Sequence, residues 1–325
     1  MKNMLLAAFC IIALISCKSE NKDVAENLIG TEEYTACYGL WSGDFEPVFA
    51  EADTMPDRSK KITIKINRII NNEVEGQSIV SGYMRPLKGG VQKSADGSLM
   101  FTLDEPGTNK YDGRYTLTLT DGEMMGSFMA YKTNPDVTRE KKLELKQKQF
   151  VYNPSLMLED EIELVDWDNP QEKKVSESEY YDGEGEGEED SIAAGEKAVA
   201  ENTATAETDT VTADPEEEPE EYVAQVFRMA SEKVYEINAS LDRLNEAQLK
   251  ELNKLDLEII RNCIFARHGY SFKKNSIRRF FEYNSWYVPV SNNVDNQLTA
   301  VEKANIALLT RMEKYAEDHY DYFGR

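Results

Sequence analysis

Residues 61–66 read Lys-Ile-Thr-Ile-Lys-Ile, and this stretch decides the fold of the N-terminal half of the chain. Successive side chains of a strand point to opposite faces, so the three isoleucines share one face and the polar residues share the other. The same alternation returns in Leu99–Leu103, Tyr115–Leu119 and Lys141–Gln147. Strands with one apolar and one polar face are typical of antiparallel sheets. We therefore expect an antiparallel β-rich domain around these segments.

Short turn signals separate these runs and indicate sequential hairpins. Asp121-Gly122 divides Tyr115–Thr120 from Glu123–Lys132, and Asn71-Asn72 divides Ile62–Ile70 from Glu73–Arg85. Dipeptides of this kind favour tight two-residue hairpin turns. The spacing predicts about seven strands in a meander, and a long meander tends to close because closure removes its exposed edges. We expect an antiparallel β meander over residues 34–158, as a barrel or a sandwich.

The first strand of this domain begins Gly39-Leu40-Trp41, which resembles the Gly-x-Trp opening of lipocalin-like barrels. The resemblance implies either a Trp41 side chain that fills one end of the barrel or a cup for a small hydrophobic ligand. Residues 34–152 contain no His, so acid–base catalysis in this domain is poorly supported.

The chain starts with MKNMLLAAFCIIALISC, in which Met4–Ile15 is an apolar run of 12 residues. A membrane-spanning helix needs about 20 apolar residues, so this run is typical of a signal peptide. It ends Leu14-Ile15-Ser16-Cys17, which resembles a bacterial lipobox. The resemblance implies removal of residues 1–16 and lipidation of Cys17 on its thiol and amine with acyl chains such as palmitate. Lys18 favours the outer membrane, on its periplasmic or surface face, with residues 17–33 as a tether.

The middle of the chain is strongly acidic. Residues 168–221 hold 20 Asp or Glu and 3 Lys, within a chain of net charge −23. Because such a composition buries too little apolar surface to offset ordering entropy, we expect residues 159–226 to be a disordered acidic linker. Fully extended, about 65 residues could reach roughly 200 Å. The charge disfavours nucleic acid as a partner, and a mean hydropathy of −0.58 excludes a polytopic membrane protein.

From residue 227 to 325 the apolar period becomes helical, which predicts a small all-α domain. We expect helices at Asn245–Gln248, at Lys254–His268, after Asn275, and from Thr299 to about Ala316. Thr299 and Glu302 have the spacing of a capping box. Gly269 stands where a left-handed C-cap is needed. The chain is therefore expected to be multidomain, with separate β and α parts.

The helical part contains Arg261-Asn262-Cys263-Ile264-Phe265-Ala266-Arg267-His268-Gly269-Tyr270, which resembles the YARHG domain, a small extracytoplasmic bacterial module. Further features of that family follow in order: Phe272, Phe280-Phe281, Trp286-Tyr287-x-Pro289 and Glu302-x-x-Asn305-Ile306. The resemblance covers residues 240–317. Phe265 replaces the Tyr of the family name, and Cys263 stands where the family often has Glu. The family's activity is not established, so the resemblance implies fold and location rather than chemistry.

We assign a structural role to the motif residues Arg261, Asn262, Phe265, Gly269, Tyr270, Glu302 and Asn305. Candidate binding residues are Arg267, His268, Lys273, Lys274, Arg278, Arg279, Trp286 and Tyr287. The four basic residues at 273–279 either form a solvated face, neutralise the acidic linker, or bind an anionic envelope polymer. An ion pair between Arg267 and Glu302 is a further expectation. Aromatic side chains beside cations suit a polymer of sugars and carboxylates.

No catalytic, metal-binding or cofactor-binding residues are predicted, because the chain has only two His and lacks the Cys and His spacing of a zinc site. Cys37 and Cys263 could pair in an oxidising compartment, although Cys263 fits a buried thiol better. The sequence favours a non-catalytic envelope lipoprotein that binds peptidoglycan, a similar polymer, or a protein partner. The alternatives are a small-ligand carrier and an envelope hydrolase built on Arg267 and His268. The oligomeric state stays open.

Overall fold

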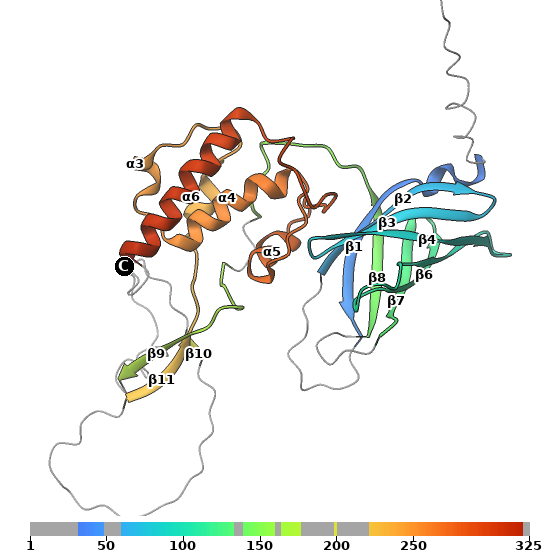
Figure 1. Ribbon diagram of the computed structural model, residues 1–325, viewed down its shortest axis with the longest axis horizontal. Helices are drawn as coiled ribbons and strands as arrows, with labels where there is room; N and C mark the ends of the chain where they lie inside the picture. The colour runs from blue at the N-terminus through green and yellow to red at the C-terminus, as the bar shows by residue number, and fades with distance from the viewer. Residues whose placement is uncertain are drawn as a thin grey trace, which may run out of the picture.

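The computed structural model describes residues 32–48, 60–132, 139–159, 164–176, 198–199 and 221–320. The segment predicted to be a signal peptide and Cys17 lie outside these ranges. Figure 1 shows a β-barrel beside a group of helices. The barrel strands are β1 (Gly39–Pro47), β2 (Lys60–Ile70), β3 (Glu73–Val80), β4 (Tyr83–Lys93), β5 (Leu99–Asp104), β6 (Gly113–Thr120), β7 (Glu123–Ala130) and β8 (Glu140–Lys148).

The strands pair in sequence order, every pair is antiparallel, and β1 pairs with β8 to close the barrel. The predicted meander is therefore confirmed and the barrel alternative holds. The barrel has eight strands instead of about seven, because the run Glu73–Arg85 is two strands joined at Ser81-Gly82. Both turn residues have positive φ, +50° and +78°, as a tight type I′ hairpin requires.

Side chains fill the inside of the barrel. Trp41, Phe45, Phe101, Tyr115 and Phe128 are at most 5% exposed, and they pack with the isoleucines of β2. The Trp41 indole N–H donates to the Cys37 carbonyl at 2.8 Å. Cys37 ends the 3₁₀ helix η1 (Glu32–Cys37), which contributes to the same core. This arrangement matches a Trp41 that fills one end of the barrel.

The C-terminal part is a compact group of helices: α2 (Lys233–Glu236), α3 (Glu246–Leu249), α4 (Lys254–Arg267), α5 (Asn275–Glu282) and α6 (Ala300–Tyr320). Its core is separate from the barrel core and centres on Phe272, Phe280, Phe281 and Tyr287. The expected helices are confirmed, and the capping box of Thr299 and Glu302 is present at the start of α6. No helix within the described ranges is both long and apolar enough to span a membrane.

The two ends of the acidic stretch meet in space. Strand β9 (Gln171–Ser176) pairs with β11 (Glu221–Val226), and the two-residue strand β10 (Ala198–Val199) joins the same small sheet. Parts of the segment expected to be disordered are thus ordered strands. Because Gln171 lies opposite Val226, the acidic stretch begins and ends at the same place in the structure. It therefore does not set the distance between the two domains, contrary to the reach expected for an extended spacer.

The outer face of the barrel is covered where it meets the helical domain. Thr63 and Ile79 are register partners that point away from the barrel core, yet both are 0% exposed. The Lys61 backbone N–H donates to Glu282 at 3.1 Å, and the Gly82 N–H donates to Ser271 Oγ at 2.9 Å. Both hydrogen bonds lie beside the covered positions, at the end of β2 and β3 that carries the Ser81-Gly82 turn. The barrel and the helical domain therefore share an interface.

Glycine at position 82 permits this close approach. A Cβ atom there would lie 2.9 Å from the Lys273 backbone nitrogen, and φ is +78°. A side chain at this turn would strain the backbone and push the two domains apart.

Candidate functional site

A ten-residue segment connects the barrel to the signature residues of the helical domain. Residues 150–159, here called the strap, follow β8 and run to the helices without regular secondary structure (Figure 1). Leu158 of the strap is 4% exposed and belongs to the core of the helical domain. The strap is thus part of that domain's packing, although it lies more than 70 residues before α2 in sequence.

Near the start of the strap, the ring of Tyr152 stacks on His268. α4 ends at Arg267, His268 is its C-cap, and Gly269 turns the chain away with a φ of +70°. The ring of Tyr152 lies 4.2 Å from the imidazole of His268, with only 11° between the planes. His268 is 2% exposed, so Tyr152 is a direct neighbour of a buried imidazole.

Both rings hydrogen-bond to one carboxylate. The Tyr152 hydroxyl donates to Glu302 Oε1 at 2.9 Å, and His268 Nε2 lies 2.9 Å from Glu302 Oε2. The Thr299 backbone N–H also donates to Oε2, at 2.8 Å. An ionised carboxylate only accepts, so His268 carries its proton on Nε2. Glu302 therefore caps α6 and anchors the strap with the same side chain.

The hydrogen bonds keep Glu302 ionised. Burial alone would raise the pKa of its carboxyl, but the bonds from Thr299, His268, Ser240 and Tyr152 lower the pKa below its ordinary value. Burial and the bond to Glu302 raise the pKa of Tyr152 to about 12, so its hydroxyl keeps its proton at neutral pH. The cluster is therefore an ionised Glu302 carboxylate that accepts hydrogen bonds from its neighbours.

Arg267 holds the middle of the strap. Its Nε donates to the Leu156 carbonyl at 2.6 Å, its Nη1 donates to Ser240 Oγ at 3.1 Å, and its Nη2 lies 3.6 Å from Met157 Sδ. Arg267 is 2% exposed, and burial lowers the pKa of its guanidinium. Glu302 acts on Arg267 as a nearby charge, while its hydrogen bonds go to His268 and Tyr152. The structure contains no direct ion pair between Arg267 and Glu302, contrary to the expectation from the sequence, because both side chains are committed to other partners.

The end of the strap is held by residues around Trp286. The Trp286 indole N–H donates to the Met157 carbonyl at 2.8 Å. The Glu159 backbone N–H donates to Asn284 Oδ1 at 3.0 Å, and Glu159 in turn accepts from the Ser285 backbone N–H at 3.0 Å. The Asn284 carbonyl also accepts from Lys61 Nζ of the barrel at 2.8 Å. This corner therefore joins the strap, the barrel and the helical domain.

The four basic residues of the predicted patch do not form one free surface. Arg278 is 4% exposed and pairs with Glu282 at 3.2 Å, and Arg279 pairs with Asp168 at 3.3 Å. The ammonium group of Lys273 lies 5.1 Å from the centre of the Tyr83 ring on the barrel. Lys273 and Lys274 are exposed. Only this lysine pair is open to an external anion among the four.

The remaining signature residues stabilise the helical domain. Arg261 pairs with Glu313 of α6, and Asn262 donates to the Glu258 carbonyl at 2.7 Å. The Asn305 amide bridges the Ala239 and Asp242 carbonyls, while Tyr270 and Phe265 meet at 5.9 Å between ring centres. Tyr287 is 1% exposed and donates to the Tyr270 carbonyl at 2.7 Å.

Sequence reasoning missed the strap residues that complete this site. Tyr152, Leu156 and Glu159 stand just beyond the last strand, where the pattern predicts only the end of the β domain. The run Tyr-Asn-Pro-Ser-Leu-Met-Leu at 152–158 carries an aromatic and three long apolar side chains, which is unusual for an exposed linker. That apolar content was the available signal.

The arrangement offers little for chemistry. His268 Nδ1 is buried and has no hydrogen-bond partner among the described residues. Cys37 and Cys263 are buried free thiols, and burial raises the pKa of each to about 11. Among the residues that the structure describes, no group of His, Cys, Asp or Glu side chains is arranged to hold a metal ion.

A second cluster of buried polar groups lies in the barrel. Glu105 accepts from Ser78 Oγ at 2.6 Å, from the Gly113 N–H at 3.1 Å and from the Tyr115 hydroxyl at 3.2 Å. Burial raises the pKa of Glu105 despite these bonds. All three donors belong to the barrel itself, so the cluster orders one end of the barrel.

Replacing Glu302 with Gln should weaken the strap and change the acid dependence of stability. We expect a loss of about 1.5–3 kcal/mol in the free energy of unfolding at pH 7, because charged hydrogen bonds are lost. The folded pKa of Glu302 is lowered, so its contribution is present above its ordinary pKa and is lost as pH falls through the folded value. Urea unfolding between pH 7 and pH 3 should show the two curves converging at acid pH.

The matched control is Glu251→Gln, at an exposed position that contacts Lys250 at 3.6 Å. Its curve should follow that of the wild type within about 0.5 kcal/mol at every pH. If the Glu302 variant also runs parallel to the wild type, Glu302 does not anchor the strap.

A family model for the YARHG domain matches residues 233–314. This range contains α2 to α5, most of α6, and every residue described above that binds the strap from the helical side. The strap itself lies outside the matched range. A search of curated proteins and a search of solved structures found no match.

Proposed function

The chain contains a YARHG domain, and from this premise we propose that it is a non-catalytic protein of the bacterial cell envelope. In this proposal the domain holds the barrel at a fixed position and binds an envelope polymer of the peptidoglycan type. The observation that carries the proposal is the use of Arg267, His268, Glu302 and Trp286 to bind the strap. Arg267 and His268, the two side chains that a hydrolase site would use, are instead buried in structural contacts.

Attachment to the membrane is part of the proposal. Cys17 would carry the lipid at the outer membrane, and several acyl chains on one residue give stable anchoring. The described structure starts at residue 32, so 14 residues separate the lipidated Cys from the barrel helix η1. Fully extended, such a tether reaches about 50 Å. The barrel and the YARHG domain would therefore both stay close to the membrane surface.

The other two functions considered from the sequence have less support. A carrier of a hydrophobic ligand needs an open interior, whereas the barrel core is filled by aromatic and aliphatic side chains. A hydrolase built on Arg267 and His268 needs access to water and substrate, whereas both side chains are 2% exposed. Binding through exposed surfaces fits the geometry better than either.

Co-sedimentation with purified peptidoglycan sacculi tests the proposal. The chain from residue 18 onward should pellet with the sacculi at low salt and less at high salt, since exposed cations contribute. Lys273→Glu with Lys274→Glu should reduce pelleting several-fold if the lysine pair takes part. The control is Lys250→Glu with Lys303→Glu, also exposed on the helical domain. If the wild type stays in the supernatant at both salt concentrations, binding to the wall polymer is rejected.

A further inference from the structure

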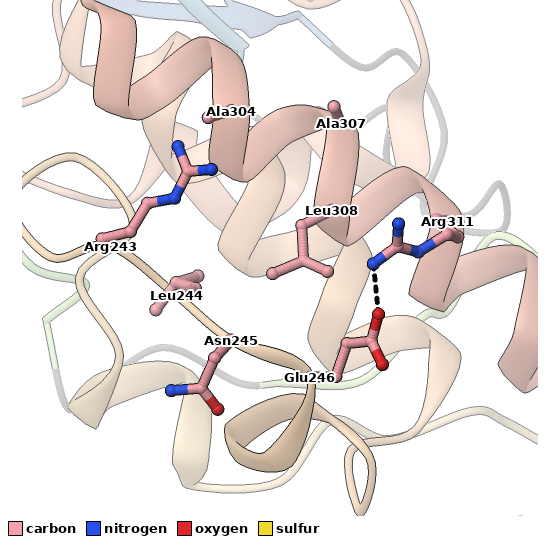
Figure 2. Close-up of a pocket in the computed structure, with 8 residues that line it drawn as sticks. All are labelled: Arg243, Leu244, Asn245, Glu246, Ala304, Ala307, Leu308 and Arg311. Atoms are coloured by element: carbon pink, nitrogen blue, oxygen red, sulfur yellow. Dashed lines mark hydrogen bonds and ion pairs between the residues drawn. The ribbon is translucent and has the colours of Figure 1, made fainter.

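A shallow groove on the YARHG domain has the features of a peptide site. It lies between α3 and α6 and has a volume of about 600 Å³. Figure 2 shows the eight residues that line it, with Leu308 of α6 between Arg243 and Arg311. None of its lining residues is among those that hydrogen-bond to the strap.

Apolar side chains line the walls of the groove, and some of them are small. Ala304, Ala307 and Leu308 line it from α6, and Leu244 lines it from the segment before α3. Leu308 is only partly buried, and Ala307 is exposed. Small side chains on one wall leave room for an extended chain with methyl-sized side chains. The volume lies in the range of sites for small ligands, which suits a few residues of peptide.

The rim of the groove is cationic. Arg243 is exposed and forms no ion pair within the described part of the chain. Arg311 bonds to Glu246 on the opposite wall, and the two side chains are 64% and 67% exposed. A guanidinium group binds a carboxylate through two parallel hydrogen bonds, so these two arginines could each hold one carboxylate. Glu246 would give up Arg311 at little cost, because exposed ion pairs contribute only about 0–1 kcal/mol.

We infer that this groove binds a short peptide that carries two carboxylates and small apolar side chains, as wall-polymer stem peptides do. The inference rests on the proposed function, since it names the site and the part of the polymer that would be recognised. The occupant is chosen from the charge of the rim and the small apolar wall. Sugars alone would leave Arg243 without an anion, and would give Arg311 no partner to replace Glu246.

Titration with soluble wall fragments tests the inference. The full chain from residue 18 onward is mixed with disaccharide-peptides from digested sacculi, and binding is followed by calorimetry. Arg243→Gln combined with Arg311→Gln should weaken binding at least about tenfold, the effect of losing one good charged contact. The control variant is Arg68→Gln, because Arg68 also forms an exposed ion pair, with Glu75 on the barrel.

A comparison of different ligands identifies what occupies the groove. Fragments with amidated carboxylates and glycan chains without stems should both bind at least about tenfold more weakly than intact fragments. If intact fragments bind and the double Arg variant binds them equally well, the groove is rejected while the proposed function stands. If neither sacculi nor fragments bind, both are rejected. If a synthetic peptide of residues 213–221, which is acidic, binds more tightly than the fragments, the occupant is the chain's own acidic segment.

Discussion

Replacing Arg267 with Ala is expected to release the strap and to lower the free energy of unfolding of the YARHG domain by about 3–5 kcal/mol. The guanidinium group is 2% exposed and bonds to the Leu156 carbonyl and to Ser240 Oγ. Removing it leaves these groups unpaired in a buried site and opens a cavity. Hydrogen-exchange mass spectrometry should show faster exchange in residues 150–159 and in α4.

The controls for this variant separate charge from position. Arg68→Ala removes an exposed guanidinium and should change stability by no more than about 0.5 kcal/mol. Arg267→Lys keeps the charge but cannot reproduce the bonds of a planar guanidinium, so it should be nearly as destabilising as Ala. If Arg267→Ala leaves exchange in the strap unchanged, Arg267 does not hold the strap.

Replacing Trp41 with Ala should lower the free energy of unfolding of the barrel by about 3–5 kcal/mol. Trp41 is 1% exposed, fills one end of the barrel, and donates its indole N–H to Cys37 of η1. The loss of a large buried side chain costs both the transfer of its surface and the cavity that remains. Thermal unfolding measures the loss of stability, and hydrogen exchange in β1 and β8 shows where in the barrel it occurs.

The control on the same barrel is Met125→Ala. Met125 lies on β7 and is 47% exposed, so the change should stay within about 0.5 kcal/mol. If Trp41→Ala is tolerated as well as Met125→Ala, the barrel has an open end and the account of a filled interior is wrong. A ligand that co-purifies with wild-type residues 18–325 in native mass spectrometry would point to the same conclusion.

Much of the fold follows from local pattern. Period-two alternation in residues 61–66 and the turns at Asn71-Asn72 and Asp121-Gly122 predict strands that the structure contains. Ser81-Gly82 was missed, because Ser at a positive φ is an uncommon turn residue and the flanking strands read as one run. Helix bounds in the YARHG domain were predicted well, because capping boxes and Gly269 mark them locally.

Only the part of the site that the helical domain contributes could be predicted from the sequence. Arg267, His268 and Trp286 stand out in the sequence as cations and aromatics, but their partners Tyr152 and Leu156 lie more than 100 residues earlier. Nothing local in the sequence links the two groups. A buried guanidinium and a buried carboxylate must find hydrogen-bond partners, so their presence in a small domain indicates that another segment completes the core.

The acidic stretch shows the same limit. Its composition predicts disorder, but residues 171–176 and 221–226 pair across the stretch. Asp166 and Asp168 are held by Arg228 and Arg279 of the helical part. Net charge alone could not predict these anchored ends.

The strap and the barrel contacts join the barrel and the YARHG domain into one body. Distance measurement by double electron–electron resonance tests it directly, with spin labels at Thr116→Cys on β6 and Lys303→Cys on α6. Both positions are exposed, and Cys37 and Cys263 are buried. We expect one narrow distance distribution, which broadens when Arg267→Ala is combined with Tyr152→Ala. A broad distribution in the otherwise unchanged protein would contradict it, because it would mean that the two domains move independently.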